Sequence, residues 1–518
     1  MVILKEKKGV KKSIVSRSPY GDEFQCLIDD EEEKEKIDSF LKKDRKTVVV
    51  QGLGFVGSAM AAALAGARNK DGVSVFNVIG VDLPDEKNLW KIMRVNSGKP
   101  PILSSDKNIE TAYENGYKNK NLIATFSNYA FTKADVVVVD INLDVKKKEL
   151  GKSDEYEFSY NSLKGAVKTV ADNINENTLI IIESTVPPAT TQKVVYPVFE
   201  DTFKNRGLDI GKLYLSYSYE RVMPGPSYLN SIVNFYRVYS GINKESRLKA
   251  REFFESFINT QDYPLSEVHS NTAAEMAKVL ENSFRAMNIA FIQEWTEYAE
   301  KAGVNLFEVI EAIRIRPTHK NIMLPGFGVG GYCLTKDPLL ADWSYQNMFH
   351  SEKKLKMSLG AIAVNDLMPN YTFNLLKEEV NSLMDKYITI MGVSYLGDVA
   401  DTRHSPTELF YDRCMKEGAV VNLHDPIVAF WTEKKLKIET DISILKNYRH
   451  DIAVFVTRHS QYLSMNADDI LKILKGVKVI IDANDIISDN TAKQLSKNGV
   501  KMIGVGKGHW INSGRLNE

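Results

Sequence analysis

The sequence predicts an α/β protein with two Rossmann-like, doubly wound domains joined by a central helical layer. Short apolar runs alternate with helical patterns between residues 45 and 245, and they do so again from 384 to the end. The stretch from 246 to 383 is mostly helical. Strands that alternate with helices are typical of parallel sheets covered by helices on both faces. A chain of 518 residues is long enough for two or three such domains.

The first α/β domain is predicted from short β-branched runs. Residues 47–51 fit a buried parallel strand, and a small-residue helix follows from 58 to 66. A further helix is expected over 160–174. The other predicted strands are 73–81, 135–139, 179–182 and 213–216.

The rest of the chain predicts a helical middle and a second α/β domain. Long apolar-rich helices are expected at 272–302, 353–365 and 371–383, with a Gly/Pro-rich loop around 316–337. Strand signals return at 387–392, 419–424, 452–456, 477–482 and 501–505. The predicted domains are a charged N-terminal extension (1–44), a first Rossmann domain (45–245), a helical domain (246–383) and a second Rossmann-like domain (384–518). About half of the extension is charged, so we expect a solvated appendage.

Composition and charge exclude several classes of function. Lys and Arg total 67, as do Asp and Glu, so the overall charge steers the protein neither to nucleic acid nor to an anionic membrane. No apolar run reaches the roughly 18–20 residues of a membrane span, and the N-terminus lacks a secretory signal. Cys26, Cys333 and Cys414 are too few for a disulfide framework or a four-thiolate zinc site. We expect a cytoplasmic protein with no metal, nucleic-acid or membrane partner.

A glycine-rich turn at 52–57 predicts a dinucleotide site. The pattern Gly-x-Gly-x-x-Gly follows a strand and opens a helix, so a pyrophosphate can approach the helix N-terminus. Asp82 ends the next strand, where it would bind the ribose hydroxyls and repel a 2′-phosphate, which favours NAD over NADP. The alternative is a glycine turn that binds another nucleotide or none. The predicted contacts are Gly52, Gly54, Phe55, Val56, Gly57 and Asp82.

Cys333 lies in a loop with glycines at 326, 328, 330 and 331. A single free cysteine is more often buried and inert. Here the glycines would let the backbone approach a ligand, and the nearby charges of Lys336 and Asp337 include a cation, which favours a thiolate. This loop is therefore a candidate chemical centre.

A predicted helix supplies a second constellation. Lys278 and Asn282 are four residues apart and share a face, with Glu275 one turn earlier. Their neighbours are mostly apolar, which predicts a buried helix. A buried lysine needs a partner, and a substrate would serve. The alternative is an internal ion pair between Glu275 and Lys278.

Two further loops follow predicted strands. Thr185 lies in a proline-rich turn at 183–190, and Glu220 and Arg221 lie at 219–225. Ligands of open α/β sheets bind at the carboxyl ends of strands, although either loop alone is more often structural.

Together these motifs give the chain a resemblance to the UDP-glucose/GDP-mannose dehydrogenase family over about residues 45–510. The segments that carry the resemblance are GLGFVG (52–57), ESTVPP (183–188), YERVMPG (219–225), AAEMAKVLEN (273–282), GFGVGGYCLTKDP (326–338) and DTRHSP (401–406).

The resemblance implies a four-electron oxidation of a sugar C6 alcohol to a carboxylate with two NAD⁺. Cys333 would attack the aldehyde to give a thiohemiacetal, and the later thioester would be cleaved by water. Lys278 and Asn282 would stabilise the oxyanions. Asp337 and Thr185 would position water, and Glu220 would assist thioester hydrolysis.

The resemblance also implies the remaining contacts. Thr185, Lys87, Lys336 and Arg403 would contact NAD. The C-terminal domain would hold UDP, and the central helices would form a homodimer. The residues implied at the substrate are Glu220, Arg221, Lys278, Asn282, Pro325, Gly326 and Gly330.

Several positions depart from the family pattern. Leu396 and Asn484 stand where the family often has a substrate-binding lysine and arginine, and Ile141-Asn-Leu143 replaces Pro-Thr-Pro. Pro224 stands where a second glutamate is common. These changes leave the Cys–Lys–Asn centre in place and put the substrate contacts in question.

The substrate and the reaction class have alternatives. The segment at 220–225 resembles the branch that acts on UDP-N-acetylhexosamines, since Arg221 would bind an N-acetyl carbonyl. UDP-ManNAc or UDP-GlcNAc is favoured, for surface polysaccharide synthesis, and UDP-glucose is the alternative. A catalytically idle nucleotide-sugar-binding protein would tend to lack Cys333, and a two-electron hydroxyacid dehydrogenase would need neither this cysteine nor a second α/β domain.

Overall fold

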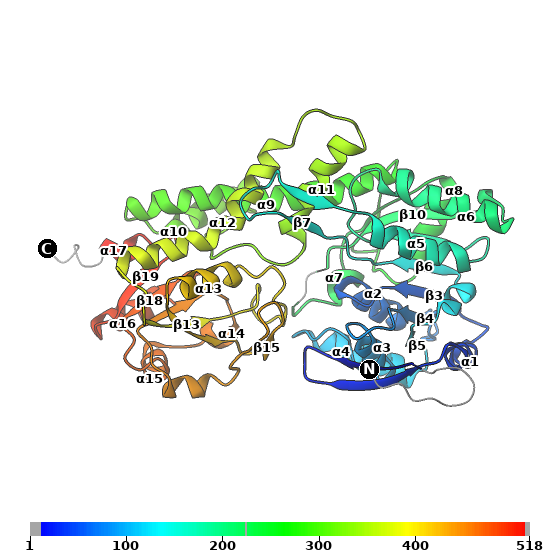
Figure 1. Ribbon diagram of the computed structural model, residues 1–518. Helices are drawn as coiled ribbons and strands as arrows, with labels where there is room; N and C mark the ends of the chain where they lie inside the picture. Colours follow the sequence, from blue (N-terminus) through cyan, green and yellow to red (C-terminus); the bar gives the residue numbers. More distant parts are fainter. Residues whose placement is uncertain (1–11, 223–224, 513–518) are drawn as a thin grey trace. The chain divides into compact units, whose positions relative to one another are not determined.

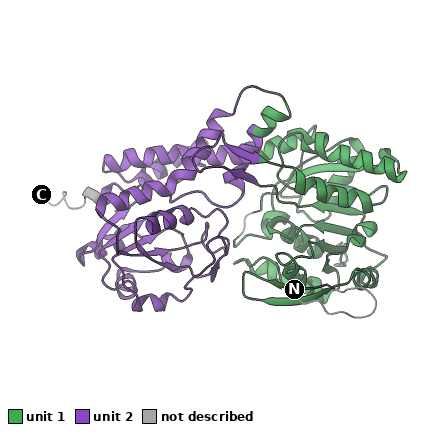
Figure 2. Cartoon of the chain, viewed as in Figure 1, with its two compact units in different colours: residues 1–144, 158–279, 343–351 green, residues 145–157, 280–342, 352–518 purple. Residues whose placement is uncertain are grey.

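The computed structural model describes residues 12–222 and 225–512, and the chain divides into two compact units (Figure 2). Unit 1 contains the residues up to 144, together with 158–279 and 343–351. Unit 2 contains 145–157, 280–342 and 352–518. The first eleven residues of the predicted extension, the last six of the chain and Pro224 lie outside the described residues.

Unit 1 is built on an eight-stranded sheet within the described residues, in the order β12-β11-β10-β9-β6-β3-β4-β5. The strands from β10 to β5 run parallel, and β11 is antiparallel to β10. This is the strand order of a dinucleotide-binding Rossmann sheet. The bounds are β3 (Lys46–Gln51), β4 (Phe76–Val81), β5 (Leu122–Thr125), β6 (Val136–Val139), β9 (Leu179–Ile182), β10 (Tyr214–Tyr219), β11 (Val238–Gly241) and β12 (Ser266–Glu267).

Helices cover the two faces of this sheet (Figure 1). Helix α2 (Phe55–Gly66) buries every residue from Gly57 to Ala65, because its small side chains allow close packing against the sheet and a neighbouring helix. The other segments of unit 1 are α3 (Leu89–Asn96), α4 (Lys107–Lys118), η1 (Asn128–Lys133), α5 (Asn161–Asn173), η2 (Thr191–Val195), α6 (Tyr196–Arg206), η3 (Ile210–Lys212), α7 (Asn230–Val233) and α8 (Lys244–Glu255).

The described part of the N-terminal extension is structured and packed, so the expected solvated appendage is wrong. Strands β1 (Lys12–Arg17) and β2 (Glu23–Ile28) form an antiparallel hairpin, and α1 (Asp30–Phe40) follows. Ile14 and Ile37 are buried in the two cores of unit 1. The expectation failed because a few well-spaced apolar residues can bury one face of a segment whose other face is charged.

Unit 2 contains a second parallel sheet, in the order β14-β13-β17-β18-β19. This order is also a doubly wound one, so the predicted fold class is confirmed. The strands are β13 (Tyr387–Met391), β14 (Val420–His424), β17 (Ile452–Phe455), β18 (Val479–Asp482) and β19 (Lys501–Gly504). The segments around them are α13 (Thr407–Lys416), β15 (Phe430–Trp431), β16 (Leu436–Lys437), η5 (Ile442–Asn447), α14 (Ser460–Leu463), α15 (Ala467–Ile473), α16 (Asp489–Lys497) and α17 (His509–Asn512).

The middle of the chain is helical, with one correction. The two helices expected at 353–365 and 371–383 are one helix, α12 (Lys356–Glu379). Pro369 lies inside it, which shows that a single missing N–H did not end the helix. The remaining segments are β7 (Val145–Lys147), β8 (Tyr156–Phe158), α9 (Asn271–Lys301), α10 (Leu306–Arg314), η4 (Pro317–His319) and α11 (Cys333–Asn347).

Helix α9 is not buried all round, contrary to expectation. Ala274 and Val279 are buried, whereas a row of large apolar side chains at helical spacing is 45–65% exposed. We call this row the α9 stripe. Its members are Met276, Leu280, Phe284, Phe291, Trp295 and Tyr298.

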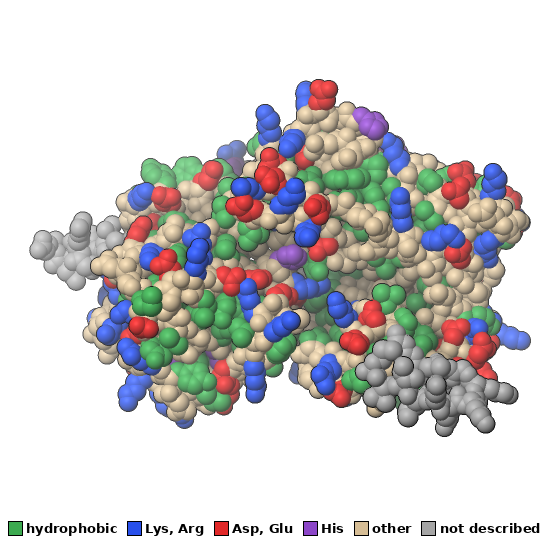
Figure 3. Space-filling model, in the orientation of Figure 1, with side chains coloured by type: hydrophobic (Ala, Val, Ile, Leu, Met, Phe, Trp, Pro, Cys, Tyr) green, Lys and Arg blue, Asp and Glu red, His purple; other side chains and the backbone are tan. Residues whose placement is uncertain are grey.

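Surface charge agrees with the zero net charge. On the face drawn in Figure 3, basic and acidic side chains are interspersed on each unit, without a broad patch of one sign. Within the described ranges, no helix combines the length and apolarity that crossing a bilayer requires.

Candidate functional site

The glycine turn between β3 and α2 packs too closely for side chains at two positions. Gly52 has φ +96°, and a Cβ there would lie 2.3 Å from the carbonyl oxygen of Asp140. A Cβ on Gly57 would lie 1.9 Å from the Gly52 carbonyl oxygen. By contrast, a Cβ on Gly54, which precedes α2, would meet no heavy atom within 4 Å. The turn is therefore tight below and open at the helix N-terminus, as a bound pyrophosphate requires.

Asp82 follows β4 and is fixed by three donors. Its Oδ2 accepts a hydrogen bond from the Leu53 amide at 3.0 Å, and its Oδ1 accepts one from the Leu83 amide at 2.8 Å. Lys91 on α3 donates to Oδ2 at 3.1 Å. Lys87 is exposed, and its carbonyl accepts a hydrogen bond from the Trp90 indole at 2.8 Å. The acid is thus held beside the glycine turn, so the residues present fit NAD.

Lys91 was not singled out from the sequence. It lies nine residues beyond Asp82, and because Asp82 follows β4 while Lys91 is on α3, no helical spacing relates the two positions. The residues before Lys91 show no apolar period long enough to predict α3.

Glu220 and Lys278 meet in unit 1. Glu220 follows β10 and is buried, and its carboxylate accepts a hydrogen bond from the Val222 amide. Lys278 donates to the Glu220 carbonyl at 2.7 Å and lies 3.5 Å from its Oε1. The Lys278 ammonium also lies 5.3 Å from the Tyr219 ring centre. Both side chains are nearly inaccessible to solvent, so water screens the interaction between their charges only weakly.

Glu275 has a different partner from the one considered at first. Its carboxylate accepts backbone hydrogen bonds from Ala189 at 2.6 Å and Thr191 at 2.7 Å. Burial raises the pKa of Glu275 to about 7, against the opposing effect of these donors. Glu275 thus anchors α9 to the backbone that follows the ESTVPP segment, at the start of η2, while Lys278 contacts Glu220.

A buried acidic pair adjoins this region and was missed from the sequence. Glu183, after β9, forms an ion pair with the buried Arg237. Asp140 follows the neighbouring strand β6, and burial, reinforced by the Glu183 charge, raises the pKa of Asp140 well above its ordinary value. The signal was a charged residue directly after an all-valine strand.

The other two predicted residues of unit 1 have defined positions. Thr185 is half-buried in the loop after β9. Arg221 donates to the Tyr236 carbonyl at 2.7 Å and to the Tyr219 hydroxyl at 2.9 Å. Its guanidinium also lies 5.9 Å from the Phe235 ring centre, so aromatic residues hold this side chain.

In unit 2, Cys333 is the first residue of α11 and is exposed. Asn282 donates to Asp337 Oδ2 at 2.6 Å, and Lys336 donates to Asp337 Oδ1 at 3.0 Å. All three of these polar side chains are buried. The structure therefore joins Asn282 to Asp337, four residues after the thiol on the helix that begins at Cys333, a link that sequence spacing alone could not predict.

The loop before Cys333 packs against the DTRHSP segment of unit 2. A Cβ on Gly330 would lie 2.9 Å from the His404 carbonyl oxygen of this segment and 2.4 Å from the Cβ of Tyr395, so the loop tolerates no side chain there. Arg403 pairs with Asp401, with its Nη2 2.7 Å from Oδ2, and its guanidinium lies 4.4 Å from the Tyr332 ring centre. The DTRHSP segment thus packs against the loop that precedes Cys333.

One of the departures from the family pattern, Asn484, contacts the same loop. A Cβ on Gly326 would lie 2.9 Å from Asn484 Oδ1, so Asn484 contacts the predicted sugar-binding stretch. Pro325 is buried, and Leu396 is exposed.

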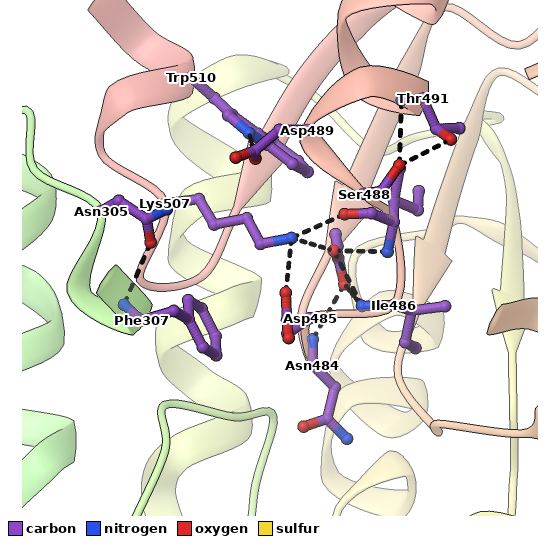
Figure 4. A network of polar contacts seen from close by, with 12 residues as sticks. Asn305, Phe307, Asn484, Asp485, Ile486, Ser488, Asp489, Thr491, Lys507 and Trp510 are labelled. Atoms are coloured by element: carbon purple, nitrogen blue, oxygen red, sulfur yellow. Dashed lines mark hydrogen bonds and ion pairs between the residues drawn. The ribbon is translucent and has the colours of Figure 1, made fainter. Parts of the chain in front are cut away.

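A lysine network fixes the segment that carries Asn484 (Figure 4). Asp482 at the end of β18 accepts hydrogen bonds from the amides of Asn484 and Ile486 at 3.2 and 2.9 Å. The buried Lys507 donates to Asp482 at 3.0 Å and lies 2.9 Å from Asp485 Oδ1. This network holds the loop at the carboxyl end of the second sheet.

The glycine turn, the fixed acid and the doubly wound sheets define an NAD-dependent oxidoreductase. Three family models match the chain: the NAD-binding domain of the UDP-glucose/GDP-mannose dehydrogenase family over residues 46–258, the central domain over 272–366 and the UDP-binding domain over 389–489. The chain belongs to the UDP-glucose/GDP-mannose dehydrogenase family, and it is a UDP-sugar dehydrogenase that uses NAD.

Individual relatives agree in length and fold. The UDP-N-acetyl-D-mannosamine dehydrogenase of Methanococcus aeolicus is 30% identical over 480 residues, which cover 92% of this chain and 99% of the relative. The structure of the UDP-ManNAc dehydrogenase from Pyrococcus horikoshii is 28% identical, with a TM-score of 0.72 over 89% of this chain and 100% of that one. The NDP-N-acetyl-D-galactosaminuronic acid dehydrogenase from Methanosarcina mazei is 26% identical, with a TM-score of 0.72 over 92% of this chain and 99% of that one.

Proposed function

We propose that this chain is a UDP-N-acetyl-D-mannosamine 6-dehydrogenase, which oxidises the C6 alcohol of the sugar to a carboxylate. The similarity to dehydrogenases of that name over nearly their whole length supports this substrate. The Glu-Arg-Val segment at 220–222 supports the same branch, with Arg221 as the donor to the N-acetyl carbonyl. The product would feed surface polysaccharide synthesis.

The position of Cys333 at the start of α11 is the observation that carries the mechanism. An exposed sulfur at a helix N-terminus is favoured as a thiolate by the free N–H groups and the helix dipole. Cys333 Sγ adds to the C6 aldehyde to form a thiohemiacetal. Loss of a hydride then leaves a thioester, and water cleaves the C–S bond to release the carboxylate and the thiol.

Lys278 and Asn282 stabilise the negative oxygen that forms at C6. They lie one turn apart on α9, so one helix face presents an ammonium and an amide. Contact with the Glu220 backbone orients Lys278, and the bond to Asp337 orients Asn282. Glu220 assists thioester hydrolysis, and Asp337 and Thr185 position water for proton transfer.

NAD, when bound, supplies the hydride acceptor for each of the two oxidations. Asp82 binds the adenosine ribose, and the N-terminus of α2 faces the pyrophosphate. The proposed contacts are Gly52, Gly54, Phe55, Val56, Gly57, Asp82, Lys87, Thr185, Lys336 and Arg403.

The substrate is held by the later parts of the chain. We assign NAD binding to residues 45–245, the catalytic cysteine loop to 246–383 and UDP binding to 384–518. Pro325, Gly326 and Gly330 line the sugar, whose contacts also include Glu220, Lys278 and Asn282. The α9 stripe supports a homodimer, because large exposed apolar rows are typical of interfaces. A thiolate nucleophile is best maintained in a reducing compartment, which supports the cytoplasm.

The deciding experiment measures NADH formed per sugar consumed with UDP-ManNAc, UDP-GlcNAc and UDP-glucose. Two NADH per UDP-ManNAc are expected, with weak or no turnover of the others. Two NADH from UDP-glucose alone would retain the chemistry and refute the proposed role of Arg221.

The thiol mechanism is tested with Cys333→Ala, for which Cys26→Ala is the matched control. We expect the first variant to form no uronic acid and the second to retain activity, because Cys26 lies on β2, outside the proposed catalytic residues. Full acid formation by Cys333→Ala would refute the thioester.

A further inference from the structure

Residues 12–40 pack against α3, the helix that contacts Asp82 near the proposed cofactor site. Both strands of the N-terminal hairpin contact α3 (Figure 1, hairpin in dark blue). Helix α3 carries Lys91, which binds Asp82. The matched NAD-binding model begins at residue 46, so this segment precedes the part of the chain common to the family.

Ser16 provides an N-terminal cap for α3 from about seventy residues earlier in the chain. The residue at the N-cap position, Asn88, makes no capping bond, because its Oδ1 accepts a hydrogen bond from Lys91 at 2.7 Å. The hydroxyl of Ser16 instead accepts a hydrogen bond from the Trp90 amide at 3.0 Å and donates one to the Glu86 carbonyl at 2.7 Å. Ser16 is fully buried, so water cannot replace it as the cap.

The hairpin tip holds the other end of the same helix. Asp22 forms an ion pair with Arg94, whose side chain is buried. The Arg94 guanidinium lies 5.2 Å from the Tyr20 ring centre, and the Tyr20 ring lies edge-on to Trp90 at 5.9 Å. Tyr20 also accepts a hydrogen bond from the Leu103 amide at 3.1 Å. A buried arginine that loses its carboxylate partner is strongly disfavoured, so this contact fixes the helix.

Helix α1 contacts the strand β5, next to the C-terminal end of α3. Lys36 donates to the Ala124 carbonyl at 3.0 Å, and Asn96 of α3 donates to the same oxygen at 2.9 Å. The extension therefore contacts α3 near both ends and the strand beside β4.

We infer that residues 12–40 are a brace that positions α3, and through Lys91 the carboxylate of Asp82, for binding the adenosine half of NAD. Ser16, Tyr20 and Asp22 are its positioning residues and touch no substrate. The inference rests on the proposed role of Asp82 at the ribose.

The test compares Ser16→Ala and Asp22→Asn with two matched controls from the same segment. Ser13→Ala removes a hydroxyl of β1 that accepts a bond from Gln25, and Asp38→Asn removes a charge of α1 that faces Tyr129. We expect the Kd of NAD⁺, measured by calorimetry, to rise about three- to ten-fold in the first two variants, the scale of a lost helix cap. The controls should leave it unchanged.

Steady-state kinetics separate positioning from a general loss of structure. In Ser16→Ala and Asp22→Asn, the KM for NAD⁺ should rise, while kcat at saturating NAD⁺ and the KM for the UDP-sugar stay within two-fold, roughly the margin of a surface substitution. A lower melting temperature with an unchanged Kd for NAD⁺ would overturn the brace and leave a purely structural role.

Asp82→Asn distinguishes failure of the brace from failure of the proposed ribose contact. If this variant binds NAD⁺ as tightly as the wild type, the proposed role of Asp82 is wrong. The proposed effect of the brace on NAD⁺ binding through Lys91 is then refuted as well. If Asp82→Asn weakens binding but Ser16→Ala and Asp22→Asn do not, the brace alone is refuted.

Discussion

At the scale of single residues, the glycine turn separates folding from cofactor binding. A side chain at Gly57 collides with the Gly52 carbonyl, whereas one at Gly54 meets open space. We expect Gly57→Ala to lower both the melting temperature and NAD⁺ affinity. Gly54→Ala should leave the melting temperature within a degree or so and weaken NAD⁺ binding at least ten-fold, because the added methyl occupies the pyrophosphate path. Equal NAD⁺ affinity of Gly54→Ala and the wild type would contradict the assigned path.

His424 gives unit 2 a pH-dependent stability. Burial lowers the pKa of His424 to about 4 from its ordinary 6.5, and its Nδ1 lies 2.6 Å from the Tyr462 hydroxyl. Between these values the unfolded chain binds a proton that the folded chain does not, so stability is full above pH 6.5 and is lost as the pH falls towards 4.

Chemical unfolding at pH 7 and pH 4.5 measures this effect. The free energy of unfolding of the wild type should fall by about 2 kcal/mol more than that of His424→Gln over this interval. His269→Gln is the control, since His269 is exposed. Parallel pH profiles of the wild type and His424→Gln would contradict the assignment.

Individual site residues could be predicted where a motif fixed their neighbours in the chain. Cys333, Lys278, Asn282 and Asp337 were named from short segments, and the structure shows the bond between Asn282 and Asp337. The partners of the buried acids could not be predicted, because Arg237, which directly precedes β11, is 54 residues away from Glu183 in the chain. The roles in the reaction of the four residues named from motifs stay predictions.

At the scale of elements, the loop after β18 depends on one buried cation. Lys507 lies between Asp482 and Asp485, and its removal would leave the fully buried Asp482 carboxylate without its cation. Lys507→Met should therefore lower the free energy of unfolding by about 3–5 kcal/mol, the typical result of breaking a buried pair.

The matched control for this prediction is Lys501→Met. Lys501 lies 3.5 Å from Glu379 and is largely exposed, so its loss should change the free energy of unfolding by less than about 1 kcal/mol. A loss from Lys507→Met as small as that of the control would show that the network is not needed for stability.

Elements were predictable where apolar period and length agreed. The strand at 179–182 was predicted with the bounds of β9, and the helix at 272–302 was displaced by one residue from α9. Strands β5 (Leu-Ile-Ala-Thr) and β11 (Val-Tyr-Ser-Gly) were missed because small and polar residues interrupt their apolar runs, whereas β9 is entirely Leu and Ile. The hairpin β1–β2 was missed because its strands carry only intermittent apolar residues.

At the scale of the whole molecule, the α9 stripe predicts self-association. The wild type should elute as a dimer when its mass is measured by light scattering. Leu280→Lys with Phe284→Lys should shift it to a monomer, because two desolvated charges at an interface are costly. Leu463→Lys changes an exposed leucine on α14 and should leave the dimer intact. A monomeric wild type would refute the dimer.

The fold class could be predicted as a whole because each half repeats one simple rule, a buried strand followed by a covering helix. The division of the chain into two compact units could not be predicted from the sequence. It places 145–157 with unit 2 and 343–351 with unit 1, and these short segments carry no apolar period of their own.

This exchange of segments has a consequence for biosynthesis. Trp343 packs against Phe158 and Tyr160, so unit 1 includes a contact between residues almost two hundred positions apart. A nascent chain that has emerged only as far as the last strand of the first sheet still lacks Trp343 and the rest of 343–351. The first unit to be translated therefore reaches its finished state only when part of the second has already left the ribosome.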